Sequence, residues 1–214
     1  PRRESRAKRP HLKIGLSTSV IQRGHSGVGQ YVLSLVNALL PLAREHAFTL
    51  YVLEADLPLF GFAAAAMCIV PVAERHRPPL KNILWHQRTL PGLVRRAGLD
   101  VLHIPSYRRM LWPQPCALVA TIHDLAPFRL AGKYDWARTL YGRVVARRLA
   151  HRQDEIVAVS QVTAADIHTF FHVPPARVTV VPNGLDHERF QPGSANRARA
   201  LVCRPRCIAE PYLL

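Results

Sequence analysis

The sequence predicts an α/β domain built on a Rossmann-like, doubly wound parallel sheet. Short apolar runs alternate with segments of helical spacing nearly to the end of the 214 residues. The runs are apolar throughout, which is typical of strands whose two sheet faces are both covered by helices. Hydrophobic residues make up 49% of the chain, enough for a sizeable buried core.

The expected elements follow one another in the order strand, then helix or loop. We expect strands at residues 12–16, 48–53, 67–72, 101–104, 117–122, 156–159 and 178–181. We expect helices at residues 28–39, 84–96, 134–151 and 163–171. After Phe190 the pattern dissolves, so three parts are predicted: a basic disordered tail at 1–10, the Rossmann-like domain at 11–190 and a connector at 191–214.

The charge is strongly basic, with a formal net value of +15. Such a charge predicts attraction to polyanions, whether nucleic acid, anionic lipid or phosphorylated substrates. One cluster recurs at helical intervals: Arg138, Arg143, Arg147, Arg148 and Arg152. We interpret it first as an exposed helix face, and second as a surface for lipid or nucleic acid.

Cysteines and apolar stretches exclude several classes. The four cysteines give no disulfide framework. Cys203 and Cys207, taken with His168 and His172, lack the compact arrangement of a zinc finger, so no metal site is predicted. The longest uncharged stretch, 57–73, is broken by prolines and a glycine and is too short to span a bilayer.

The stretch RGHSGVGQY at 23–31 follows the first expected strand and leads into a helix. Gly24 and Gly29 have the spacing of a P-loop. Gln30 and Tyr31 stand where that motif needs a lysine and a hydroxyl that holds magnesium, so a nucleoside triphosphatase is not predicted.

A dinucleotide fingerprint fits this stretch only in part. Gly27 and Gly29 begin it, but Val32 replaces the third glycine. Glu54, at the end of the second strand, stands where a ribose-binding acid would, which keeps this alternative open.

Both motifs share the physics of amides at a helix N-terminus, freed of side chains by glycine. Such amides favour an anion. A tight turn that needs glycine only for its dihedral angles is the competing interpretation. We favour the anion-binding one for Gly27, Val28 and Gly29, because the loop follows the first strand.

Polar residues follow three other strands at their carboxyl ends, where doubly wound folds bind ligands. His123 and Asp124 follow the run VATI, and we expect His123 to contact a sugar hydroxyl or a reacting oxygen. Ser106 and Tyr107 leave another strand, and tyrosine offers a flat face and a hydroxyl to a carbohydrate ring. Asn183 lies in a turn signal after the last strand, where an amide directed into the cleft competes with a purely structural role.

These motifs together resemble the N-terminal half of the GT-B glycosyltransferases of family 4, also called group 1. The resemblance rests on SGVGQY, DVLHIPSY, TIHDLAPF, IVAVSQVTAADI and VTVVPNGLDHERF, found in that order. It covers the chain from about Leu12 to Phe190.

The resemblance implies a function for the glycine loop and for His123. The loop at Gly27, Val28 and Gly29 would approach the diphosphate and sugar of a nucleotide-sugar donor, which is a co-substrate, so no cofactor is expected. His123 would touch the transferred sugar, beside Asp124. Family members mostly retain the anomeric configuration without a metal, since positive side chains stabilise the departing diphosphate. The N-terminal domain would bind the acceptor, a glycan or a lipid-linked molecule.

The chain also departs from the family pattern. Ser17, Thr18 and Ser19 stand where the family often has Asp or Arg. The donor-gripping groups of the family belong to a C-terminal domain, and the chain, which begins at Pro1, is expected to be a fragment that by itself catalyses little or nothing.

We expect a cytoplasmic protein that touches the inner face of an anionic membrane through its basic helix. Two alternatives remain open: a dinucleotide-dependent oxidoreductase that uses Gly27, Gly29 and Glu54, and a non-catalytic polyanion-binding domain. Specific nucleic-acid binding is not expected, since no nucleic-acid fold is recognisable.

Overall fold

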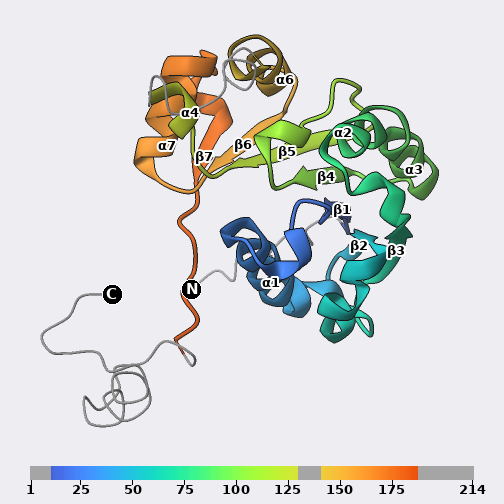
Figure 1. The fold of residues 1–214 in the computed structure, drawn as a ribbon. Helices are drawn as coiled ribbons and strands as arrows, with labels where there is room; N and C mark the ends of the chain where they lie inside the picture. The colour runs from blue at the N-terminus through green and yellow to red at the C-terminus, as the bar shows by residue number, and fades with distance from the viewer. Residues whose placement is uncertain (1–10, 130–140, 188–214) are drawn as a thin grey trace, which may run out of the picture. The chain divides into compact units, whose positions relative to one another are not determined.

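The strands of the protein form one parallel sheet (Figure 1). A computed structural model describes residues 11–129 and 141–187. The strands in this part are β1 (Lys13–Ser17), β2 (Ala47–Leu53), β3 (Cys68–Val72), β4 (Val101–Ile104), β5 (Ala117–Ile122), β6 (Glu155–Ala158) and β7 (Val178–Val180). Their spatial order is β3-β2-β1-β4-β5-β6-β7.

Every neighbouring pair of strands runs parallel. The strand order reverses direction between β1 and β4, where Leu16 pairs with His103. In doubly wound sheets, ligands bind at this switch point, outside the carboxyl ends of the strands. The predicted fold class is confirmed, and each expected strand lies within one residue of its observed ends.

Helices connect the strands and cover both faces of the sheet. The described helices are α1 (Gly27–Leu39), α2 (Pro79–Arg88), α3 (Leu90–Ala97), α4 (Ala126–Arg129), α6 (Arg147–Ala150) and α7 (Gln161–Asp166). The 3-10 segments are Gln22–Gly24, Leu40–Arg44, Glu54–Ala63, Glu74–His76, Tyr107–Arg109 and Pro175–Arg177, and the π-helical turns are Tyr141–Ala146 and Ile167–Phe171.

The core lies on both sides of the sheet. On β2, Leu50 packs in one cluster with Val36 of α1. Its neighbour Tyr51 points the opposite way and packs with Trp85 of α2. Figure 1 shows α1 on one side of β1 and β2, and α2 and α3 on the other. Because both faces are covered, the strands carry buried apolar side chains on both faces of the sheet, as the sequence predicts.

One predicted helix is wrong in its extent. The single helix expected at 84–96 is two helices that meet at Thr89. Pro91 explains the break, because proline has no amide hydrogen to donate and its ring clashes with the carbonyl four residues earlier. The chain therefore turns between α2 and α3.

The compact unit that carries the sheet ends at Asn183, and a second unit begins at Gly184. Of the second unit only residues 184–187 are described, and they are exposed. The predicted tail at 1–10, the connector at 191–214 and residues 134–140 of the predicted basic helix lie outside the described residues.

Candidate functional site

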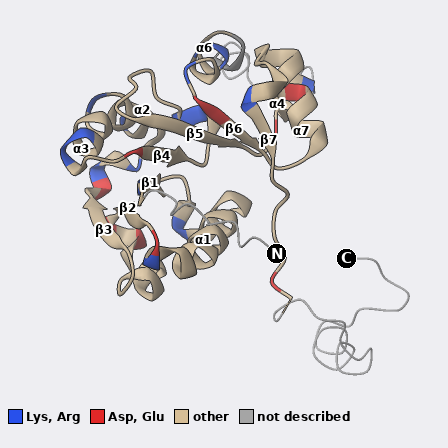
Figure 2. Cartoon of the chain, turned by 180° about the vertical axis from the view of Figure 1, so that it is seen from behind, with Lys and Arg blue, Asp and Glu red and all other residues tan. Residues whose placement is uncertain are grey.

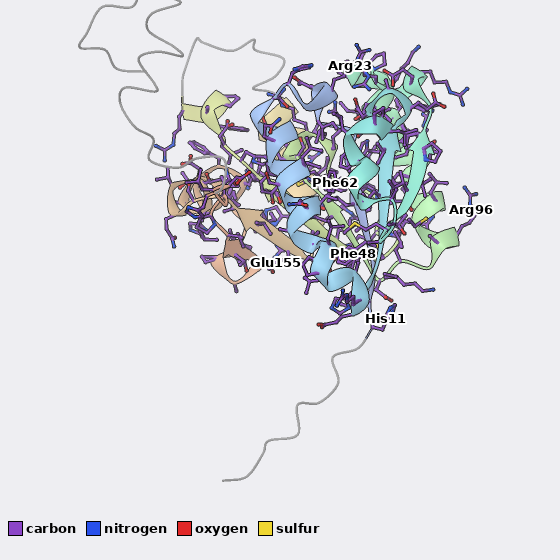
Figure 3. All side chains as sticks on the ribbon, turned by 90° about the horizontal axis from the view of Figure 1, so that it is seen from below. His11, Arg23, Phe48, Phe62, Arg96 and Glu155 are labelled. Atoms are coloured by element: carbon purple, nitrogen blue, oxygen red, sulfur yellow. The ribbon has the colours of Figure 1, made fainter. Side chains whose placement is uncertain are left out.

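A cleft of about 540 Å³ lies where β1, β4 and β5 end. Its walls come from the loop after β1, the start of α1, Arg77 and Pro79 at the start of α2, residues 106–109 after β4, and His123 and Asp124 after β5. In Figure 3, Arg23 of this cleft and His11, which precedes β1, lie at opposite ends of the domain. The cleft thus occupies the carboxyl end of the sheet, where the sequence predicts it.

The loop between β1 and α1 has an unusual backbone. Gln22, Arg23 and Gly24 have φ angles of 47°, 56° and 78°. Two consecutive non-glycine residues in the left-handed region store strain, which often marks a functional loop. Gln22, Arg23 and Ser26 line the cleft.

Gly29 is required by close packing. A Cβ atom there would lie 2.5 Å from the carbonyl oxygen of Ile21. The hydroxyl of Ser26 caps α1 by accepting a hydrogen bond from the amide of Gly29 at 3.0 Å. Gly29 therefore fits the structural interpretation, because its amide is already used.

The first two amides of α1 have a different setting. Within the described residues, Gly27 and Val28 make no backbone hydrogen bond to a protein acceptor, as expected for the start of a helix. A Cβ atom on Gly27 would meet open space, and Val28 lines the cleft. These amides are the ones available to an anion.

His123 is held on several sides. Its ring lies edge-on to that of Tyr31, with 4.7 Å between centroids, and its backbone carbonyl accepts a hydrogen bond from the hydroxyl of Thr163 at 3.2 Å. Burial lowers the pKa of His123, against the hydrogen bond with Pro105 and the charge of Asp124, which raise it. The imidazole is therefore neutral at pH 7.

The hydrogen-bonding state of His123 follows from its partners. The carbonyl of Pro105 can only accept, so the ring donates to it. Nε2 is buried without a partner among the described residues, so the donor is Nδ1–H. In the neutral ring Nε2 then carries the lone pair, and because this atom has no access to solvent, a ligand in the cleft does not reach it in this structure.

Asp124, Ser106 and Tyr107 also line the cleft. Asp124 is exposed, and its carboxylate accepts a hydrogen bond from the amide of Ala126 at 3.1 Å, which shapes the turn into α4. Ser106 precedes a 3-10 turn, and its carbonyl accepts a hydrogen bond from the amide of Arg109 at 3.0 Å. Tyr107 contacts Arg108, whose guanidinium lies 5.5 Å from the centre of its ring.

Sequence reasoning missed the arginines of the cleft. Arg23, Arg77, Arg108 and Arg109 line it, against one acidic residue, Asp124. The sequence did hold a signal for three of them. Arg23 is the first residue of the glycine stretch RGHSGVGQY, and Arg108 and Arg109 directly follow VLHIPSY. A cleft of this composition favours anionic ligands.

A buried polar network around Asn82 supports the part of the cleft wall that Arg109 forms. Asn82 is 1% exposed. Its side-chain oxygen accepts hydrogen bonds from Arg109 and, at 3.4 Å, from Ser19, and its amide donates to the carbonyl of His76 at 3.0 Å. Asn82 therefore fixes the position of the Arg109 guanidinium at the cleft.

Two sequence candidates lie away from the cleft. Asn183 is exposed and is not among the residues that line it. Glu54 is not among them either, and its carboxylate accepts a hydrogen bond from the amide of Glu74 at 3.0 Å. The oxidoreductase alternative thus lacks a ribose-binding acid at the site.

Residues 11–129 and 141–187 contain no group of three histidine, cysteine or acidic side chains placed to hold a metal ion. Over the same residues, no helix combines the length and the apolar character needed to cross a bilayer.

Comparison with known proteins places residues 25–189 in the sequence model of Glycosyltransferase Family 4. The MMP α-(1→4)-mannosyltransferase of Mycolicibacterium hassiacum is 34% identical over 122 residues, which cover 49% of this chain and 28% of that protein.

Solved structures share the fold at low identity. HepE of Anabaena, in complex with UDP-glucose, superposes with a TM-score of 0.60 at 16% identity, over 92% of this chain and 50% of its own. A glycosyltransferase of Rickettsia africae gives a TM-score of 0.54 at 12% identity, over 94% of this chain and 50% of its own. The chain spans about half the length of these structures.

Proposed function

The chain belongs to glycosyltransferase family 4, and from that premise we propose that it forms the acceptor-binding N-terminal domain of an enzyme that transfers a sugar from a nucleotide-sugar donor. One observation carries the proposal: the start of α1 and His123 line the same arginine-rich cleft. Amides suited to a diphosphate and an imidazole ring that can lie against a sugar therefore share one site.

On the donor side, the amides of Gly27 and Val28 would face the diphosphate, whose charge the helix N-terminus favours. His123, which lines the cleft, would contact the transferred sugar through its ring. HepE in complex with UDP-glucose has the same fold, which supports a donor of this kind. The donor is a co-substrate in this proposal, and no cofactor is invoked.

On the acceptor side, Ser106 and Tyr107 would contact a glycan or lipid-linked acceptor in the same cleft. Asp124 would shape the loop that carries His123, because its carboxylate is bonded to the next turn. Asn183 has no role in this proposal.

We further propose retention of the anomeric configuration without a metal. Arginines line the cleft, and positive side chains can stabilise a departing diphosphate in place of a cation. The remaining donor contacts would lie in the half of the solved relatives that this chain does not cover, so the chain alone would have little activity.

A cytoplasmic location and contact with an anionic membrane complete the proposal. In the basic cluster, Arg147 and Arg148 are exposed on α6, whereas Arg152 lies over the ring of Trp112, 4.7 Å from its centre. Arg138 and the side chain of Arg143 lie outside the described residues. The exposed pair supports the contact through charge.

Isothermal titration of the complete protein with UDP-, GDP- and ADP-sugars tests the proposal. We expect one class of nucleotide sugar to bind, and His123→Ala to weaken it by roughly tenfold, since the contact between the ring and the sugar is lost. The matched nucleotide without its sugar should bind equally to both proteins. No heat with any nucleotide sugar would contradict the proposed donor.

A further inference from the structure

The backbone carbonyl of His123 lies just beyond the paired part of the sheet. Pairing between β5 and β6 ends at Ile122 and Ala158. A carbonyl that follows a strand lies outside the ladder and needs another donor where water is kept away. The hydroxyl of Thr163 on α7 supplies one at 3.2 Å, and Thr163 is only 6% exposed. This hydrogen bond joins a residue of the cleft to a helix whose residues are not among those that line it.

The direction of this hydrogen bond follows from the hydroxyl groups involved. The hydroxyls of Ser160 and Thr163 are 3.0 Å apart, and each carries one hydrogen. The carbonyl of His123 can only accept, so Thr163 donates its hydrogen there and Ser160 donates to Oγ1 of Thr163. The amide of Thr163 donates to Oγ of Ser160 at 3.1 Å, which caps α7. The hydroxyl of Thr163 is therefore already directed at His123 by the start of its own helix.

A second contact ties the same segment to α7. The guanidinium of Arg129, at the end of α4, forms an ion pair with both carboxylate oxygens of Asp166, at distances of 2.6 to 2.9 Å. Asp166 is 6% exposed and follows Thr163 by three residues, so the two side chains lie on one side of the helix. Figure 1 and Figure 2 show α4 beside α7 from opposite sides. One helix thus holds the segment from His123 to Arg129 at both of its ends.

We propose that Thr163 is a positioning residue, whose hydrogen bond to the backbone of His123 sets the direction in which the imidazole ring meets the transferred sugar. Tyr31 and the carbonyl of Pro105 hold the ring itself. Thr163 holds the peptide group from which this side chain starts. A displacement of about 1 Å in a contacting group can lower a rate by about a hundredfold. The role in transfer rests on the proposed function, whereas the hold of Thr163 on His123 does not.

NMR of the imidazole nitrogens in this chain tests that hold without any substrate. In the wild type, Nδ1 of His123 carries the hydrogen and donates it to Pro105. Thr163→Val keeps the shape of the side chain but removes the donor to the carbonyl of His123. We expect the nitrogen signals of His123, assigned by comparison with His123→Ala, to move from those of the Nδ1–H tautomer toward a mixture of both tautomers. Thr163→Ser keeps the hydroxyl and should give the wild-type signals.

Ser160→Ala is the matched control for the stability of α7. It removes the cap of the helix but leaves the hydroxyl of Thr163 beside the carbonyl of His123. Thermal unfolding should occur at a lower temperature in Ser160→Ala, since a cap is lost, while the signals of His123 stay as in the wild type. Equal displacement of those signals in Ser160→Ala and Thr163→Val would mean that His123 responds to any loosening of α7. Such a result, or unchanged signals in Thr163→Val, overturns the positioning role.

Isothermal titration of the complete protein with UDP-, GDP- and ADP-sugars tests the role in sugar recognition. We expect Thr163→Val to weaken the nucleotide sugar that binds by about as much as His123→Ala, roughly tenfold, and Thr163→Ser to bind it as the wild type does. The matched nucleotide without its sugar should bind equally to all of these proteins. Weakening in His123→Ala but not in Thr163→Val overturns the role of Thr163 and leaves the proposed function standing. An absence of binding with every nucleotide sugar contradicts the proposed function, and with it any role of Thr163 in transfer.

Discussion

The aromatic ring of Tyr31 lies edge-on to the imidazole of His123, with 4.7 Å between centroids and 83° between planes. The hydroxyl of Tyr31 is 3.2 Å from Oγ1 of Thr121, which also lies 2.7 Å from Nε2 of His103. Tyr31 stands one helical turn after Gly27. A single side chain of α1 therefore links the glycine loop to the strand that leads into His123.

We predict that Tyr31→Ala raises the pKa of His123. Burial is the main cause of the lowered pKa of this ring, and removal of the tyrosine admits water to it. The pKa should move up toward the ordinary value of 6.5. Histidine NMR titration of this chain measures the shift.

Tyr31→Phe is the matched control for this prediction. It keeps the aromatic ring against His123 and removes only the hydroxyl near Thr121. The pKa of His123 should then stay close to that of the wild type. An unchanged pKa in Tyr31→Ala would show that the ring of Tyr31 does not shield the imidazole.

Sequence patterns predicted the fold and the position of the cleft because both depend on local signals. Apolar runs define strands, and parallel strands end at one edge, so residues that follow them, such as Ser106 and His123, meet there. The glycine stretch could be located in the same way, because it directly follows the first strand in the sequence. The contact between the rings of Tyr31 and His123 could not be predicted from the sequence. The two residues are far apart along the chain, and their contact depends on how α1 packs on the sheet.

The two glycines that begin α1 should respond differently to alanine. Gly29→Ala would place a Cβ atom 2.5 Å from the carbonyl oxygen of Ile21 and 3.2 Å from Cα of Gly24. Both contacts are backbone, so the loop or the helix has to shift, at a cost of about 1–3 kcal/mol. Urea denaturation measures the loss in the free energy of unfolding.

Gly27→Ala provides the comparison within the same helix. A Cβ atom on Gly27 meets open space, and alanine favours the helix, so the free energy of unfolding should stay equal or rise slightly. Equal destabilisation by the two substitutions would refute the packing role assigned to Gly29.

The Arg77–Asp56 ion pair should be strongly coupled. Asp56 is fully buried, and one of its carboxylate oxygens lies 3.0 Å from Nη2 of Arg77. Arg77→Met leaves that carboxylate buried without its cation, which should cost about 3–5 kcal/mol. Arg77 also pairs with Glu74, but that carboxylate is reached by solvent, so its share is small.

A double-mutant cycle separates the pair from its surroundings. Asp56→Asn/Arg77→Met should be more stable than Arg77→Met, because the uncompensated charge is gone. Free energies of unfolding of the four proteins give the coupling energy. Purely additive effects would mean that Arg77 stabilises the domain through packing and not through Asp56.

The arginines and Asn82 show what the sequence leaves hidden. Arg77 precedes α2 and Arg109 follows β4, and only the sheet order brings them to one cleft. Asn82 sits in an ordinary amphipathic helix, where nothing in the spacing marks it as the acceptor for Arg109. Such long-range polar contacts follow from the assembled fold, so patterns along the chain do not reveal them.

His86 is buried next to Asn82 and is neutral in the folded protein. Its Nδ1 lies 2.8 Å from the backbone carbonyl of Asn82, which can only accept, so Nδ1 carries the proton. Nε2, 2.9 Å from the hydroxyl of Ser17, then accepts from that hydroxyl. Burial lowers the pKa of His86 to about 3, the hydrogen bond with Asn82 raises it, and the charge of Arg109 lowers it further.

Stability should therefore fall as the solution is acidified below the pKa of an unfolded histidine, 6.5. Above that pH His86 is neutral in both states and contributes no dependence. Below that pH, His86 binds a proton in the unfolded chain, whereas in the folded chain it stays unprotonated down to about pH 3. The free energy of unfolding therefore drops by about 1.4 kcal/mol per pH unit for this residue. His103, whose pKa burial lowers to about 4, acts in the same direction. Urea denaturation at pH 7 and about pH 4.5 should thus show a smaller loss in His86→Gln than in the wild type, by roughly 3 kcal/mol. Equal losses in the two proteins would mean that His86 is protonated in the fold at the lower pH, and that its bond to Asn82 outweighs its burial.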